Sequence, residues 1–194
     1  MKTLLIVLMM LLGGCAMQSP SSQFYVLSAR APVSHPVASG LLLGVGPVNL
    51  ADYLDRSQIV RRDSNVRLRM DEFNRWAGDH GKNITVVLAE NLANILGVEG
   101  VIPYPWSSSL DLDYQVLLDI SRFDAKAGNL VVLDAQWQLF RKRPREQLLQ
   151  VKRSHIETRA ADSSHDAQVE AQSQALAKLA TIIAAAVASS AGND

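Results

Sequence analysis

Two consecutive stretches between residues 113 and 140 alternate apolar and polar side chains, as β-strands with one buried face do, and a third strand is expected at 147–159. The apolar face is formed in the first stretch by Tyr114, Val116, Leu118 and Ile120, and in the second by Val131, Leu133, Ala135, Trp137 and Leu139. Short turns join the three stretches, so we expect an antiparallel meander. A sheet with one apolar face needs a covering layer, and this requirement constrains the fold more than any other feature of the chain.

Two segments repeat their apolar residues with the 3.6-residue period of a helix that could supply this layer. In "KNITVVLAENLANILG" (82–97) they form one stripe, and Gly97 is placed to end the helix. The preceding Gly78-Asp79-His80-Gly81 leaves the start of this helix open. The second segment is rich in alanine and begins near Ser163 and Asp166, which have the spacing of a capping box.

Two further β-rich stretches, 24–29 and 41–50, precede the helices, and Pro47 is expected at or beyond the end of the second strand. The predicted order is strands, helix, three strands, helix. This order indicates an α+β domain with two layers, in which two main helices pack on one face of a mostly antiparallel sheet.

The segment "QIVRRDSNVRLRM" predicts a hairpin. Ile59 and Val60 belong to its first strand, and Asp63-Ser64-Asn65 is the expected turn. In the second strand Val66, Leu68 and Met70 alternate with Arg67 and Arg69, which predicts one buried face and one basic, solvated face.

The chain opens with Lys2 and an uninterrupted apolar run from residue 4 to residue 12. As a helix this run is about 14 Å long, whereas the hydrocarbon core of a bilayer is about 30 Å thick. Residues 1–14 are therefore predicted to be a signal peptide. We expect residues 15–22 to be a tether, residues 23–190 a single periplasmic domain and residues 191–194 a frayed tail.

Cys15 is the only cysteine in the chain. Leu12-Gly13-Gly14-Cys15 resembles the bacterial lipobox, and this resemblance implies that Cys15 becomes the lipidated N-terminus of the mature protein. The alternative is an ordinary signal peptide beside an unrelated cysteine. Ala16, by similarity to the enterobacterial sorting rule, favours the outer membrane over the inner one.

Composition argues against several classes of function. Lys+Arg and Asp+Glu number 19 each, so no excess of positive charge would attract nucleic acid. One cysteine permits no disulfide within the chain and no cysteine-rich metal site. The four histidines lack metal-ligand spacing, and Gly44-x-Gly46 lacks the third glycine of a dinucleotide-binding loop. We therefore expect no catalytic residues, no metal, no cofactor and no enzymatic activity.

Two charged groups have a structural and a functional interpretation. Asp111 and Asp113 are expected to be a solvated start of a strand, and less so an acid–base pair. The basic run from Arg141 to Arg145 is expected to be a solvated turn, with a contact to phosphate or to a partner protein as the alternative.

Several segments together resemble the paraquat-inducible protein C family, the auxiliary lipoproteins of ABC-type and MCE (mammalian cell entry) transport systems. They are "FYVLSA" after Cys15, "GVGPVNLADYLDRSQIVRR", "EFNRWAGDHGKNITVVLAENLANILG", "YQVLLDISRFDA" and "LVVLDAQWQL". The resemblance implies a non-enzymatic lipoprotein held in the outer membrane by its acyl chains and facing the periplasm. It also implies docking with an MCE-domain periplasmic protein and its inner-membrane permease, assembly into a homo-oligomeric ring, and transport of phospholipid or other hydrophobic cargo.

The alternative function is a stand-alone envelope lipoprotein that binds a small ligand or a cell-envelope polymer. For the transport hypothesis the candidate residues of a partner or subunit interface are Tyr53, Leu54, Arg56, Arg61, Arg62 and Trp76. Core packing is the favoured interpretation of Trp76. The arginines could pair with carboxylates of a neighbour or form a solvated sheet face.

Overall fold

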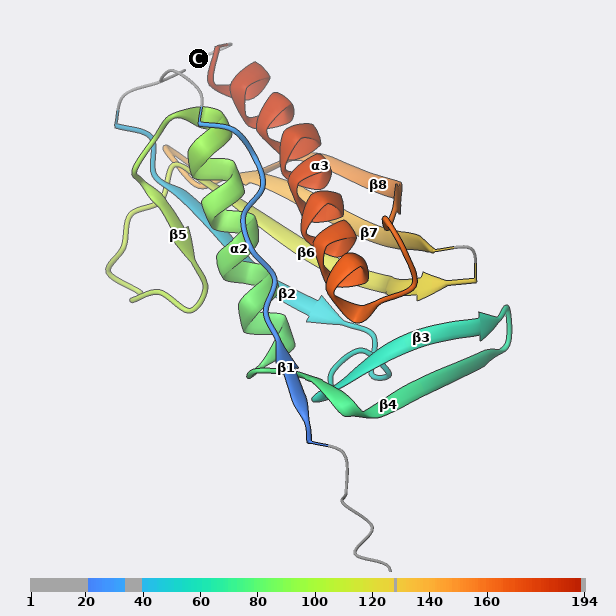
Figure 1. Ribbon diagram of the computed structural model, residues 1–194. Helices are drawn as coiled ribbons and strands as arrows, with labels where there is room; N and C mark the ends of the chain where they lie inside the picture. Colours follow the sequence, from blue (N-terminus) through green and yellow to red (C-terminus); the bar gives the residue numbers. More distant parts are fainter. Residues whose placement is uncertain (1–20, 34–39, 128, 193–194) are drawn as a thin grey trace, which may run out of the picture.

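A computed structural model of the protein describes residues 21–33, 40–127 and 129–192 (Figure 1). Residues 1–14, Cys15 and the first part of the predicted tether lie outside the described residues, as do residues 193 and 194 of the expected tail. The elements are β1 (Gln23–Tyr25), β2 (Leu43–Leu50), β3 (Gln58–Ser64), β4 (Arg67–Trp76), α2 (His80–Leu96), β5 (Val101–Pro103), β6 (Tyr114–Lys126), β7 (Leu130–Arg141), β8 (Gln147–Arg159) and α3 (His165–Ala191).

The strands form one sheet of eight strands, in which β1-β4-β3-β6-β2-β5 are successive neighbours and β7 lies between β6 and β8. The predicted meander is confirmed, because β6 pairs with β7 and β7 with β8 in antiparallel register over nearly their full lengths. The sheet is mixed, since β1 pairs with β4, and β2 with both β5 and β6, in parallel. The antiparallel pairings are the longest, and the α+β class is confirmed.

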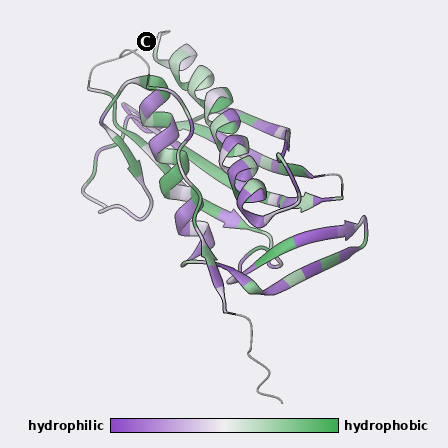
Figure 2. Ribbon diagram, viewed as in Figure 1, coloured by the Kyte–Doolittle hydropathy of each residue, from purple (hydrophilic) through white to green (hydrophobic). Residues whose placement is uncertain are grey.

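Helices α2 and α3 cover the same face of this sheet (Figure 1). The core lies between the layers, and Figure 2 shows hydrophobic residues concentrated on the central strands and along the C-terminal half of α3. Its largest fully buried side chains include Trp137 and Leu133 of β7, Leu118 of β6, Leu88 of α2 and Leu176 of α3. The indole nitrogen of Trp137 donates to the hydroxyl of Ser154 over 3.1 Å, which satisfies the one polar atom of this large side chain.

Capping residues determine where the two helices begin and end. Asp79 precedes α2 and accepts a hydrogen bond from the backbone of Lys82 over 2.9 Å, so the helix starts two residues before the predicted position. Gly97 ends it with a left-handed φ of 65°. Before α3 the capping residue is Ser164 and not Ser163. The hydroxyl of Ser164 accepts a hydrogen bond from the backbone N–H of Ala167, and the backbone N–H of Ser164 donates to the carboxylate of Asp162. By length and composition alone α3 could cross a membrane, but its leucines pack against the sheet.

Two predicted strands differ from the structure. The first strand ends at Tyr25 instead of residue 29, because the next residues follow α2: Leu27 donates its backbone N–H to Asn83, and Arg30 donates to Asn91. Pro47 lies inside β2 and not at its end. The register between β2 and β6 shifts at this point, and an irregularity of this kind tolerates the missing N–H of proline.

The hairpin is confirmed, but its turn lies at 65–66 and its predicted buried face is wrong. Val66 is 95% exposed, and Met70 is also exposed. The distal part of β3 and β4 projects beyond the helices, so no second layer covers it (Figure 1). Ile59 and Val60, at the base of the hairpin, are the buried residues.

Candidate functional site

The six candidate interface residues lie on the hairpin β3–β4 and on the loop at 51–57 that precedes it. The loop turns back on itself, with the N–H of Leu54 bonded to the carbonyl of Ala51 over 2.8 Å. The end of β4 is fixed to the loop by a hydrogen bond of 2.7 Å from the N–H of Trp76 to the carbonyl of Ser57. The structure thus brings the six positions together at one end of the molecule.

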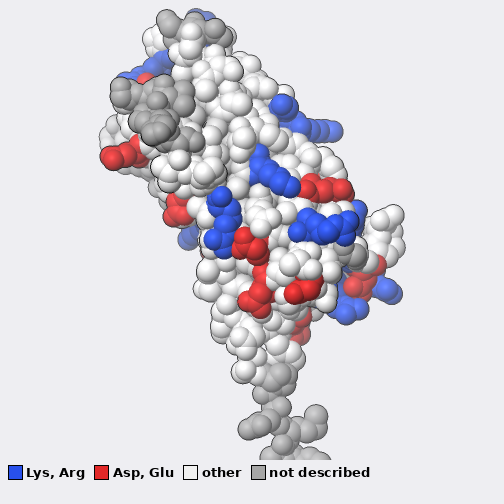
Figure 3. Space-filling view, turned by 45° about the horizontal axis from the view of Figure 1, so that its top comes forward, with Lys and Arg blue, Asp and Glu red and all other residues white. Residues whose placement is uncertain are grey.

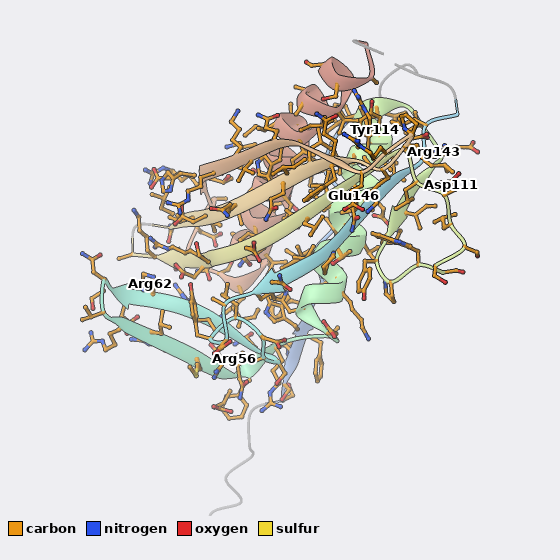
Figure 4. All side chains as sticks on the ribbon, turned by 180° about the vertical axis from the view of Figure 1, so that it is seen from behind. Arg56, Arg62, Asp111, Tyr114, Arg143 and Glu146 are labelled. Carbon is orange, nitrogen blue, oxygen red and sulfur yellow. The ribbon has the colours of Figure 1, made fainter. Side chains whose placement is uncertain are left out.

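Arg62 and Tyr53 are bound to Asp124 of β6 (Figure 4 labels Arg62). The side chain of Asp124 is 0% exposed, and its oxygens accept from Arg62 over 2.9 Å and from Arg122 over 3.0 Å. The hydroxyl of Tyr53 donates to the same carboxylate over 3.2 Å, and the guanidinium of Arg62 stands 5.7 Å from the tyrosine ring centroid. A buried carboxylate requires such partners, so this cluster fixes the loop to the sheet.

The cluster also changes the acidity of its members. Burial raises the pKa of the Tyr53 phenol, and the neighbouring carboxylate of Asp124 raises it further. The hydrogen bond to Asp124 raises the pKa of Arg62. Both shifts keep the phenol neutral and the guanidinium charged. The charge of Arg62 is therefore engaged within the chain.

Leu54 and Trp76 are buried, and the core interpretation of Trp76 is confirmed. The indole ring of Trp76 stacks on His80, with 4.0 Å between ring centroids, and Phe123 lies on the other side of the histidine at 6.1 Å. Burial lowers the pKa of His80 to about 3. Its Nδ1 is buried without a hydrogen-bond partner among the described residues. Leu54 and Trp76 thus pack in the hydrophobic core.

Arg56 and Arg61 are partly exposed. Arg61 lies on the helix side of the sheet near His165, whose imidazole contacts Asp71 at 3.2 Å. Burial lowers the pKa of His165; Asp71 opposes this shift, whereas the charge of Arg61 adds to it. Arg56 reaches β4 from the opposite side, and its Nη1 lies 2.8 Å from the sulfur of Met70.

Beside these residues lies an exposed apolar surface that the sequence did not predict. We call it the β1–β4 patch; it consists of Phe24, Val26, Met70 and Phe73, with exposed fractions of 65%, 58%, 39% and 42%. Phe73 belongs to the "EFNRW" motif, but the motif alone does not show which of its aromatic residues is buried. In the structure, the side chain of Trp76 points toward the helices and is buried, whereas that of Phe73 points away from them and is exposed.

A second cluster lies at the other end of β6, where Arg143 contacts both Asp111 and Asp113 (Figure 4). Asp113 also accepts the backbone N–H of Leu42 over 2.8 Å, and Lys142 pairs with Glu146 at 2.7 Å. The two aspartates therefore tie the β7–β8 turn to the start of β6, an arrangement unlike an acid–base pair. Asp111 is largely solvated, whereas Asp113 is less so.

The sheet face that the helices leave uncovered carries an open groove of about 650 Å³. Its lining includes the polar side chains of Asp119, Asp134, Gln136, Arg153 and His155. The Nδ1 of His155 lies 2.5 Å from a carboxylate oxygen of Asp134. Within the described part of the chain no group of three or more His, Cys, Asp or Glu residues is placed to hold a metal ion.

Charges of both signs are interspersed over the surface shown in Figure 3, and the lower end, where β1 lies, shows few of them. No single-sign field covers this face. The arrangement suits contact with another polar–apolar surface better than steering of a highly charged ligand.

Comparison with known proteins gives one family. The model of the ABC-type transport auxiliary lipoprotein component matches residues 25–184. A crystal structure of an uncharacterized protein is similar to this chain with a TM-score of 0.70 and 22% identity, over 87% of this chain and 99% of the other. A DUF330 protein from Xanthomonas campestris gives a TM-score of 0.67 and 16% identity, over 83% and 92%. Among curated proteins none matches significantly.

Proposed function

Because the chain belongs to the ABC-type transport auxiliary lipoprotein family, we propose that it is a lipid-anchored, non-enzymatic subunit of a transport system for phospholipid or other hydrophobic cargo. In this proposal its acyl chains, attached to Cys15, hold it in the outer membrane facing the periplasm. The domain docks with an MCE-domain periplasmic protein that is joined to an inner-membrane permease, and it assembles with further copies of itself into a ring.

The observation that carries the proposal is the family match over residues 25–184, which begins a short distance after the only cysteine. A lipidated cysteine just before a folded domain keeps that domain close to a membrane. Anchoring becomes stable when more than one acyl chain is attached, since each buried CH₂ contributes about 0.8 kcal/mol.

Arg61 is the candidate contact with a partner, because it retains exposed surface while the other five candidate residues are buried or engaged within the chain. It lies on β3 of the hairpin, where a partly exposed guanidinium can pair with a carboxylate of the neighbouring protein.

The proposal is tested by purifying the tagged, acylated protein from membranes in mild detergent and identifying its partners by mass spectrometry. We expect an MCE-domain protein, its permease and more than one copy of this chain. A monomer without transport proteins, from cells that produce the transporter, contradicts the proposal. Cys15→Ala is the matched anchor control: we expect it to leave the membrane fraction.

The groove on the open sheet face supports a second candidate, the stand-alone binder of a small polar ligand or a cell-envelope polymer. Its lining offers carboxylate, guanidinium, imidazole and amide groups in one hollow. Saturable binding of such a ligand by the acylated protein, abolished by Arg153→Ala and unaffected by loss of the transporter, favours this candidate.

A further inference from the structure

The β1–β4 patch is an exposed apolar surface that gathers two aromatic side chains. The protein has four phenylalanines, and the two exposed ones, Phe24 and Phe73, both belong to this patch. Isolated exposed apolar residues are ordinary, but neighbouring exposed aromatic side chains mark contact surfaces.

The sheet register places the patch on one face. Phe24 pairs with Arg75, and Phe73 precedes Arg75 by two residues, so these side chains point to the same side. Arg75 pairs with Gln58, and Met70 pairs with Val60. Gln58 and Val60 are two residues apart on β3 and point to the same side, so Met70 lies on the same side as Arg75. The opposite face of β4 carries Trp76, which packs on α2. The patch therefore faces away from the helices, on the side that Figure 4 displays.

The position of the patch in the chain limits what can cover it. β1 is the first strand and lies at the lower end of the molecule in Figure 1, whereas the C-terminus lies at the upper end. The segment from Cys15 to Phe24 can span at most ~30 Å, at about 3.3–3.6 Å per residue. An acyl chain on Cys15 would keep Phe24 within this distance of the membrane, whatever other contacts the domain makes.

Two arginines border the patch, and one of them, Arg75, also pairs with Glu72 at 3.5 Å. Arg75 lies beside Phe24, and the guanidinium of Arg56 contacts the sulfur of Met70 at the margin of the patch. Arginine side chains can lay their aliphatic stems along an apolar surface and extend the charged group to lipid phosphates. Apolar side chains with such a rim are typical of segments that lie in the interface of a bilayer.

We propose that the β1–β4 patch rests on the bilayer that holds the acyl anchor, with Phe24 and Phe73 inserted at the boundary of headgroups and acyl chains. This inference rests on the proposed function, from which it takes the anchor at Cys15. It adds the orientation of the domain: the sheet face near β1 is turned to the lipid, and the helix side of the hairpin, with Arg61, remains accessible to a partner protein.

The test uses the acylated full chain in vesicles of phosphatidylethanolamine with a minor share of phosphatidylglycerol. Lipidation blocks the sulfur of Cys15, so Phe73→Cys introduces the one free thiol for an environment-sensitive fluorophore. Val86→Cys on α2 is the matched control, because Val86 is 41% exposed and Phe73 is 42% exposed. Spin-labelled lipids with the quencher near the headgroups report how close each fluorophore lies to the interface.

We expect at least about twofold stronger quenching from position 73 than from position 86, with a blue-shifted emission at position 73 alone. Equal quenching at the two positions in protein that floats with the vesicles overturns the inference but leaves the anchor intact. Protein that does not float overturns the anchor and the inference together. A blue shift at position 73 without quenching by lipid shows that a second copy covers the patch, and this result also overturns the inference.

Discussion

The buried imidazole of His80 makes stability dependent on pH, and the size of the effect follows from its surroundings. The ring is enclosed between Trp76 and Phe123, and burial lowers its pKa to about 3. An unfolded chain binds this proton with a pKa of about 6.5. As the pH falls below 6.5, the unfolded state takes up the proton first, so the free energy of unfolding decreases until the pH reaches the folded-state pKa.

At pH 4.5, two units below the unfolded pKa, His80 alone should lower the free energy of unfolding by about 3 kcal/mol. His80→Phe removes the titrating group and keeps a flat ring between the two aromatic neighbours. We therefore expect the variant to lose less stability than the wild type between pH 7.5 and pH 4.5, by about 2–3 kcal/mol.

Urea unfolding followed by circular dichroism measures this difference at both pH values. All other titrating groups are common to the two proteins, so the change in their difference isolates His80. If wild type and His80→Phe lose equal stability on acidification, the argument from burial is refuted.

Two other predictions use matched pairs of variants. Arg62→Met should lower the free energy of unfolding by about 3 kcal/mol, because Asp124 loses a partner in a fully buried site. The control, Arg61→Met at the adjacent position, should change it by less than about 0.5 kcal/mol. Equal losses of stability in urea titrations of the two variants would show that the buried ion cluster is unimportant. Gly46→Ala should cost about 1–3 kcal/mol, since φ is 121° and the new Cβ would lie 2.6 Å from the Cβ of Tyr104. Gly78→Ala, whose Cβ would meet nothing within 4 Å, is the control, and equal thermal midpoints of the two variants would contradict this account.

The core of the fold could be predicted from sequence because its signals are local. The alternation places every second residue of β6 from Tyr114 to Ile120, and of β7 from Val131 to Leu139, in the core, and Gly97 ends α2 as its position predicts. The shift at Pro47 could not be predicted, because it depends on how β2 meets β6.

The candidate site could be located from sequence only in part. The motif residues at 53–62 do lie together, but their roles depend on partners far along the chain. From sequence alone Arg62 is a basic residue on an expected exposed strand. Only the structure shows that it is paired with Asp124 of β6. The exposure of Phe24 and Phe73 likewise depends on the pairing of β1 with β4, and no periodic pattern in the sequence predicts this pairing.

The central claim is that the anchored domain docks with an MCE-domain protein, and cross-linking in intact cells tests it most directly. A photoactivatable amino acid at position 61 probes the hairpin end, and the same residue at Thr181, on the exposed side of α3, is the control. We predict that position 61 captures an MCE-domain periplasmic protein and that position 181 captures it much more weakly. Absence of this protein among the cross-links from position 61, in cells that produce the transporter, would contradict the claim.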